Sequence, residues 1–169
     1  MRRTEAIESI GVLITALCLL TFYLGNAAIA SETDWSVFVD HDSKGKVCWA
    51  VSRANDRGET LMFVTRHRGD RQSEVSIKIV PIPESMSRVS LQVGNRVVTM
   101  FLRKKGGELW AWPRSKADEK RIVSAVQTFE RAIGGTTGLF YLIQEGAVIA
   151  SFSAKGFGHA MGVAMKECS

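Results

Sequence analysis

The chain carries three histidines, three cysteines and many carboxylates as groups that could do chemistry. The histidines are scattered, at His41, His67 and His159, and they share no metal-ligand spacing with cysteine or carboxylate. No Gly-x-Ser-x-Gly turn presents a nucleophile, and no glycine-rich loop follows a strand to hold a phosphate. We therefore predict no metal, no cofactor and no catalytic residues, and so a protein that is not an enzyme.

Trp110 and Trp112 alternate along a short apolar segment that ends at Pro113. Because alternate residues of a strand point to the same face, the two indoles are expected to lie side by side. Such a pair can stack on a sugar or on a partner protein. Packing in a sheet core is the other interpretation, since large aromatic side chains are usually buried. Trp110 and Trp112 are the candidate binding surface.

The first thirty residues have the layout of a cleavable export signal. Arg2 and Arg3 precede an apolar run over residues 10–24, and the small residues Ala28 and Ala30 follow it. An uncleaved membrane anchor is the alternative, because this stretch approaches the roughly 20 residues that span a bilayer. We predict a signal peptide at residues 1–30, a single domain at 31–169 and no integral membrane span after cleavage.

Loss of the leader would remove Cys18 and leave Cys48 and Cys168. In an exported chain, an even pair of cysteines predicts one disulfide in an oxidising compartment. Two free buried thiols are the alternative. The bridge would hold the C-terminal segment on the sheet, with Phe157, Met161 and Ala164 buried beside Cys48.

Composition and charge narrow the class of partner. With 22 basic and 17 acidic residues the chain has a net charge of +5, and its charges are interleaved. This surplus weakly favours anionic surfaces such as lipid or glycan. No basic helix or recognised module is present, so we predict no nucleic-acid partner. We expect a periplasmic, outer-membrane-associated or secreted protein that contacts an unknown envelope or host component, and the sequence leaves its oligomeric state undetermined.

Period-two alternation of apolar and polar residues dominates the middle of the chain. Turn residues such as Gly94-Asn95 and Glu145-Gly146 separate the segments. Many short strands at this spacing predict a mostly β fold, an antiparallel β-sandwich of the immunoglobulin-like type. The nine predicted strands cover residues 35–40, 47–51, 61–65, 75–80, 89–93, 97–102, 109–112, 139–143 and 148–152.

Two stretches instead predict helices. In residues 116–133, apolar residues recur at three- and four-residue steps, with acidic residues near the start and glycines after the end. In residues 155–168, one stripe carries Phe157, Ala160, Met161, Ala164 and Cys168. The glycines of this second stretch weaken the prediction, because an internal glycine costs roughly 1 kcal/mol relative to alanine.

Two further patterns have alternative interpretations. Residues 68–70 spell Arg-Gly-Asp, the integrin-recognition tripeptide, but Gly-Asp is also ordinary turn chemistry. Carboxylates distant in sequence, such as Glu59, Glu74 and Glu108, could still meet in space and serve as the acid and base of a periplasmic hydrolase with an unrecognised active site.

One ordered set of segments covers nearly all of residues 34–168. Its members are Asp34–Val39, Lys46–Ser52, Arg57–Glu59, Leu61–Val64, Ser73–Ser76, Val89–Gly94, Ala111–Pro113, Asp118–Ala125, Phe152–Phe157, Ala160 and Cys168. Taken in this order, the segments resemble the invasion-associated locus B family of exported bacterial proteins. The resemblance implies a β-sandwich domain that is periplasmic or surface-associated and linked to host-cell invasion, without an established active site.

Overall fold

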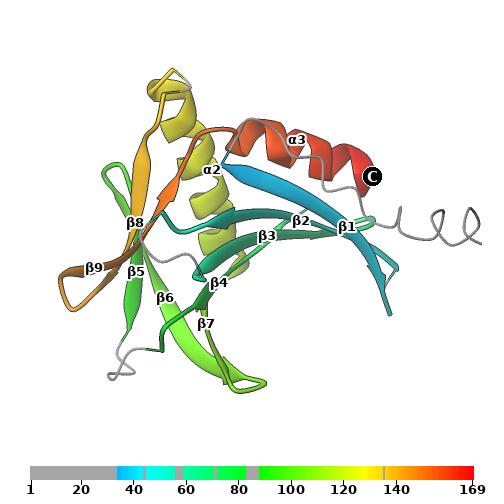
Figure 1. Cartoon of the computed structure of the whole chain (residues 1–169). Helices are drawn as coiled ribbons and strands as arrows, with labels where there is room; N and C mark the ends of the chain where they lie inside the picture. The colour runs from blue at the N-terminus through cyan, green and yellow to red at the C-terminus, as the bar shows by residue number, and fades with distance from the viewer. Residues whose placement is uncertain (1–33, 44, 56–58, 71, 83–87, 135) are drawn as a thin grey trace, which may run out of the picture.

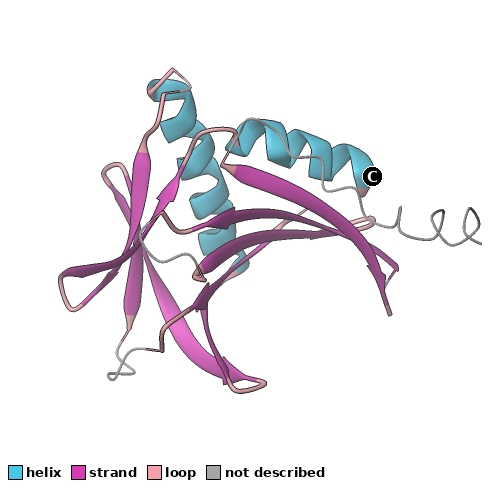
Figure 2. Ribbon diagram, viewed as in Figure 1, coloured by secondary structure: helices cyan, strands magenta, loops and turns pink. Residues whose placement is uncertain are grey.

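The computed structural model describes residues 34–43, 45–55, 59–70, 72–82, 88–134 and 136–169. The predicted signal peptide at residues 1–30 lies outside them. The strands and helices follow one another along the chain as shown in Figures 1 and 2. They are β1 (Trp35–Asp42), β2 (Gly45–Arg53), β3 (Leu61–His67), β4 (Glu74–Ile79), β5 (Val89–Val93), β6 (Arg96–Lys105), β7 (Glu108–Pro113), α2 (Lys116–Ala132), β8 (Leu139–Gln144), β9 (Ala147–Ser153) and α3 (Phe157–Glu167).

All nine predicted strands and both predicted helices are present. β4 shows why the pattern works, because Val75, Ile77 and Ile79 are buried while the residues between them are half-exposed. Glycines with positive φ make the tight turns, including Gly94 between β5 and β6 and Gly146 between β8 and β9. The described part of the chain is mostly β with two helices, as predicted.

The strands form one antiparallel sheet of nine strands in the order β1-β2-β3-β4-β7-β6-β5-β8-β9. The predicted division into two packed sheets of an immunoglobulin-like sandwich is not confirmed. The reason is the pairing of β4 with β7, in which Ile77 lies opposite Ala111 and Lys78 lies opposite Trp110. This pairing joins the β1–β4 half to the β7-β6-β5-β8-β9 half, so the described strands stay in a single sheet.

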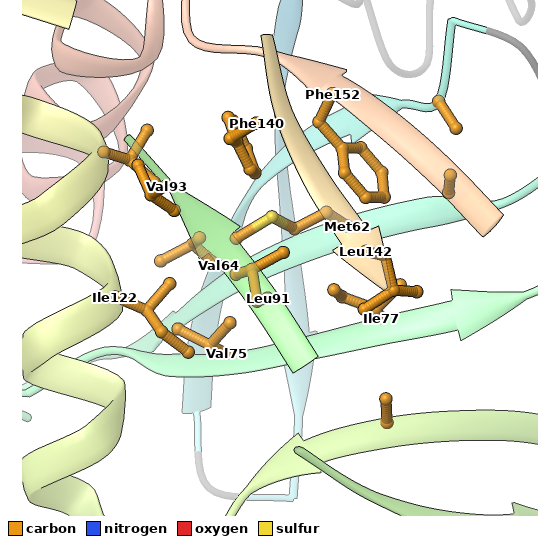
Figure 3. Close-up of a cluster of buried hydrophobic side chains, with 14 of the residues drawn as sticks. Met62, Val64, Val75, Ile77, Leu91, Val93, Ile122, Phe140, Leu142 and Phe152 are labelled. Atoms are coloured by element: carbon orange, nitrogen blue, oxygen red, sulfur yellow. The ribbon is translucent and has the colours of Figure 1, made fainter. Parts of the chain in front are cut away.

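The sheet curves until its two ends meet around a shared core. The indole Nε1 of Trp35, at the start of β1, donates a hydrogen bond of 2.8 Å to the carbonyl of Ser153, at the end of β9. The backbone N–H of Asn55 likewise donates to the carbonyl of Ser151 at 2.9 Å. Figure 3 shows the result, in which side chains of β3 and β4 face those of β5, β8 and β9.

Helix α2 packs on the sheet through an apolar face. Ile122 and Val126 are buried in the core that the two halves of the sheet share. The helix begins at the cap residue Ser115, whose hydroxyl accepts the Asp118 N–H at 3.2 Å. It ends before Gly134, which takes a positive φ of 60° that suits a glycine after a helix.

Helix α3 lies along β1 and β2 and is joined to β2 by the predicted disulfide (Figure 1). Cys48 and Cys168 are bonded, with their Cα atoms 6.1 Å apart. Ala164 is buried beside the pair, as expected. Phe157 and Met161 are also buried, but they belong to the main core, where the Phe157 ring meets the Trp35 indole at 4.8 Å. No helix among the described residues is both long and apolar enough to cross a membrane.

The start of α3 is capped by a side chain from α2, a contact that the sequence did not predict. The carboxylate of Glu130 accepts hydrogen bonds from the backbone N–H groups of Gly156 at 2.8 Å and Gly158 at 2.7 Å. A Cβ on Gly158 would lie 2.9 Å from this carboxylate. A negative group at a helix N-terminus satisfies unpaired N–H groups and complements the helix dipole. Gly158, one of the glycines that weakened the helix prediction, therefore allows the close approach of Glu130.

We predict that Cys168→Ser lowers the free energy of unfolding by about 2–5 kcal/mol, since it opens a long covalent loop. Urea unfolding of the oxidised wild type and the variant measures the difference. The C-terminal segment of the variant should become sensitive to protease while the sheet persists. Two free thiols in the native, oxidised protein would contradict the prediction.

We predict that Glu130→Ala lowers the free energy of unfolding by about 1–2 kcal/mol, because two N–H groups of α3 lose their acceptor. Hydrogen exchange should show faster exchange at the Gly156 and Gly158 amides. The matched control is Thr128→Ala, at an exposed position of the same helix. Equal stability of the two variants would show that the cap is dispensable.

Candidate functional site

Trp110 and Trp112 lie on the face of the sheet that points away from the core. Their neighbours Leu109 and Ala111 are fully buried, whereas the two indoles are only partly buried. Because side chains alternate along a strand, burial of one pair sends the other pair to the opposite face. We call this face, which α2 and α3 do not cover, the outer face. Packing of the two tryptophans in the core is thus not what the structure has.

The two tryptophans belong to a connected set of aromatic side chains from separate strands. The ring centroids of Trp110 and Trp112 are 5.8 Å apart with planes at 23°, and Phe63 of β3 lies 5.5 Å from Trp110. Phe101 of β6 lies opposite Trp112 in the sheet, and the Arg88 guanidinium sits 5.9 Å from the Phe101 ring. We call Phe63, Phe101, Trp110 and Trp112 the aromatic strip.

Next to the aromatic strip, the outer face of β1, β2 and β3 is hollowed into an open groove of about 560 Å³. Phe38 is the most exposed aromatic of this groove, with 42% of its surface accessible. Asp34 and Arg53 are its charged lining residues. The remaining lining residues are Ser36, Phe38, Trp49, Val51, Leu61 and Phe63.

The contribution of β1, β2 and β3 to this surface was not predicted from the sequence. A signal was present in the continuous apolar runs Val47–Val51 and Leu61–Val64, where residues of both parities are apolar. Such runs occur in strands that are covered on both faces. Here the core covers one face, and the other face is the lining of the groove.

A polar network sits beside the aromatic strip. The Lys78 ammonium donates to the Glu108 carboxylate, which also accepts the Trp110 indole N–H at 3.2 Å. The hydrogen bond from Lys78, helped by the Lys78 charge and the Trp110 N–H, lowers the pKa of Glu108 below its usual range. These contacts fix the orientation of the Trp110 ring on the outer face.

Basic residues border the aromatic strip. Arg103, Lys104 and Lys105 end β6, in the hairpin at the bottom of Figure 1, and with Trp112 and Pro113 they line a second groove of about 440 Å³. Arg53, Glu59, Leu61, Lys78 and Val80 line a third groove of about 370 Å³. The outer face therefore combines apolar rings with positive charge.

The other sequence candidates do not assemble into a site of this kind. The carboxylate of Glu74 pairs with Lys116 at 3.2 Å, whereas Glu108 pairs with Lys78, so these two carboxylates have different partners. Glu59 lines the third groove as its one carboxylate. Among the described residues, no three histidine, cysteine or acidic side chains are grouped to hold a metal ion. Residues 68–70 form an exposed turn after β3.

Comparison with protein-family models, curated proteins and solved structures finds no match to this chain. The resemblance to the invasion-associated locus B family stays a prediction.

We predict that Glu108 titrates below the ordinary glutamate pKa of about 4.3. Because the pKa of Glu108 is lowered in the folded state, the Lys78 contact stabilises the fold at pH values above the unfolded-state pKa. That stabilisation is lost as the pH falls through the folded-state pKa. A ¹³C NMR titration of the Glu108 carboxyl measures the midpoint, and Lys78→Met should raise it. If the Glu108 carboxyl of the wild type titrates at or above the ordinary glutamate pKa, the proposed effect of Lys78 on Glu108 is wrong.

Proposed function

We propose that this protein is an exported, non-catalytic binding module of the bacterial cell envelope, of the invasion-associated locus B type. It contacts an envelope or host component through the outer face, with Trp110 and Trp112 in the contact. On this proposal residues 1–30 are a cleaved signal peptide and the mature protein is periplasmic, outer-membrane-associated or secreted. The single curved sheet is then a variant of the antiparallel sandwich in which the two layers remain hydrogen-bonded to each other.

The observation that carries this proposal is the aromatic surface of the outer face. The core already buries the apolar side chains of the other face, so Phe63, Trp110 and Trp112 are not needed to close it. Contiguous apolar area that a fold leaves partly exposed commonly marks an interaction site. Tryptophan is also among the residues that contribute most to binding energy at interfaces.

The disulfide supports the assignment to an oxidising compartment. Cys48 and Cys168 are bonded and buried, and such structural bridges persist outside the reducing cytoplasm. A link to host-cell invasion rests on the family resemblance alone.

We predict that the protein, expressed in its native host, is recovered outside the cytoplasm as the mature form, and that this form binds isolated envelope membranes or host-cell surfaces. Trp112→Ala should weaken this binding about 5- to 150-fold, because each lost aromatic contact is worth about 1–3 kcal/mol. Cosedimentation at a series of protein concentrations measures the affinity, and circular dichroism checks that the variant is folded.

The control is Tyr141→Ala, which removes a half-buried aromatic ring from β8, outside the aromatic strip. It should bind as the wild type does. Recovery of full-length protein solely from the cytosol would refute the envelope assignment. Equal binding by the wild type and Trp112→Ala would refute the assignment of the binding surface.

A further inference from the structure

One line of residues crosses five neighbouring strands of the outer face and alternates charged with apolar side chains. Arg53 of β2 lies opposite Leu61 of β3, and Leu61 lies opposite Lys78 of β4. Lys78 lies opposite Trp110 of β7, which in turn lies opposite Arg103 of β6. Residues directly opposite in antiparallel strands share one face, so these five side chains form a row across the strands. We call it the cationic row.

The cationic row has a regular repeat. Neighbouring strands are about 4.8 Å apart, and the three cations are separated by one intervening strand each. Arg53, Lys78 and Arg103 therefore follow one another at intervals of about 10 Å. Leu61 and Trp110 fill the intervals with apolar surface.

The charges at the two ends of the row are available to a ligand. Arg53 and Arg103 are exposed, and neither forms an ion pair with a carboxylate in the part of the chain that the structure describes. Lys78, in the middle, is bound to Glu108. Lys104 and Lys105 follow Arg103 along β6 and add positive charge at the end of that strand. An anionic partner would therefore bind without first breaking an ion pair at either arginine.

Beside the cationic row runs apolar surface that is also arranged across the strands. Val51 lies opposite Phe63, and Trp112 lies opposite Phe101. Trp110 connects this surface to the row through its contacts with Phe63 and Trp112. The matching ligand is therefore extended, with an apolar face and an acidic group at a regular interval.

We propose that the outer face binds an extended acidic polysaccharide, which lies across β2, β3, β4, β7 and β6 along the cationic row. This proposal rests on the proposed function and names the chemical class of its ligand. The C–H faces of pyranose rings pack on Trp110, Phe63 and Leu61. Two sugar rings span about the interval of two strands, and Arg53 and Arg103 are four strand intervals apart. Carboxylates four sugars apart therefore pair with these two arginines, and the carboxylate between them lies over Lys78.

Carboxylates near the row favour a sugar chain over a phosphodiester chain. Glu108 lies between Lys78 and Trp110, and Glu59 and Asp34 lie in the grooves that Arg53 also lines. Carboxylates accept hydrogen bonds from hydroxyl groups, which every sugar of a polysaccharide supplies. Phosphates follow one another more closely along a nucleic acid than carboxylates do along this polysaccharide, so the same acidic side chains repel a phosphodiester chain more strongly. The open groove over β1, β2 and β3 is also better suited to an extended chain than to the flat surface of a bilayer.

The test measures binding of the full-length protein to hyaluronan, which carries a carboxylate on every second sugar, by isothermal titration calorimetry. Carboxyl-reduced hyaluronan is the neutral match. We expect binding to hyaluronan and at least about tenfold weaker binding to the reduced polymer, as for loss of charge-assisted hydrogen bonds. Raising the ionic strength from about 0.01 M to about 0.15 M should weaken binding, because the Debye length falls from about 30 Å to about 8 Å.

Variants assign the binding to the cationic row. Arg53→Gln and Arg103→Gln should each weaken hyaluronan binding about tenfold, because each removes one charge-assisted contact. The matched control is Arg96→Gln, which removes the same charge from the exposed, opposite end of β6. It should bind as the wild type does.

Three results would overturn the proposal: equal binding of hyaluronan and its reduced form, equal effects of Arg96→Gln and Arg103→Gln, or tighter binding of single-stranded oligothymidylate than of hyaluronan. A protein that binds envelope membranes through Trp112 but does not bind hyaluronan would refute the acidic polysaccharide and leave the proposed function standing. Equal envelope binding by the wild type and Trp112→Ala would instead refute the binding surface on which both proposals rest.

Discussion

Trp35 lies where the first and last strands of the sheet come together, and the rest of the structure depends on that meeting. Its indole donates to the Ser153 carbonyl and packs edge-on against Phe157, so β1, β9 and α3 share one buried side chain. Curvature that brings the two ends together lets one sheet enclose its own core. The buried side chains of β3 and β4 then pack in the same core as those of β5, β8 and β9 (Figure 3). Antiparallel strands twist, and this twist allows a long sheet to coil in this way.

Because the core is enclosed by one face of the sheet, the side chains of the outer face do not contribute to it. Each strand has two faces, and only one of them points into the enclosed volume. The two helices pack against the sheet, α2 on the core that both halves share and α3 along β1 and β2. α3 is held there by the disulfide, by Glu130 at its start and by the Lys46–Glu167 ion pair of 3.1 Å near its end. The aromatic side chains of the outer face lie opposite these attachments and take no part in them.

Order on the outer face comes from packing and charge together. Trp110 is held by its contacts with Phe63 and Trp112 and by the hydrogen bond of its N–H to Glu108. A rigid aromatic ring loses little conformational entropy when a partner binds, so a surface of this kind is already prepared for contact. The exposed arginines at the ends of the cationic row act over a longer range, since they attract an anionic partner before contact.

The sequence by itself determined the local elements of this protein. Alternation in segments such as Val75–Ile79 predicted strands, and the three- and four-residue spacing of Ile122, Val126 and Phe129 predicted the first helix. The pairing of Cys48 with Cys168 was also within reach, because those were the two cysteines outside the predicted leader. The strands and the helix follow from side-chain periodicity, and the disulfide follows from the number of cysteines. None of these predictions needs to know which residues are distant neighbours in space.

Only the tertiary structure decided which strands are neighbours. The pairing of β4 with β7 made one sheet where two were expected, and it placed Lys78 beside Trp110. The same pairing aligned Arg53 and Arg103 in one row, although fifty residues of chain separate them. Period-two alternation shows which face of a strand is apolar but not which strand lies next to it. The order of the strands depends on how all of them pack around one core. The arrangement of residues on the outer face could therefore be determined only from the folded structure.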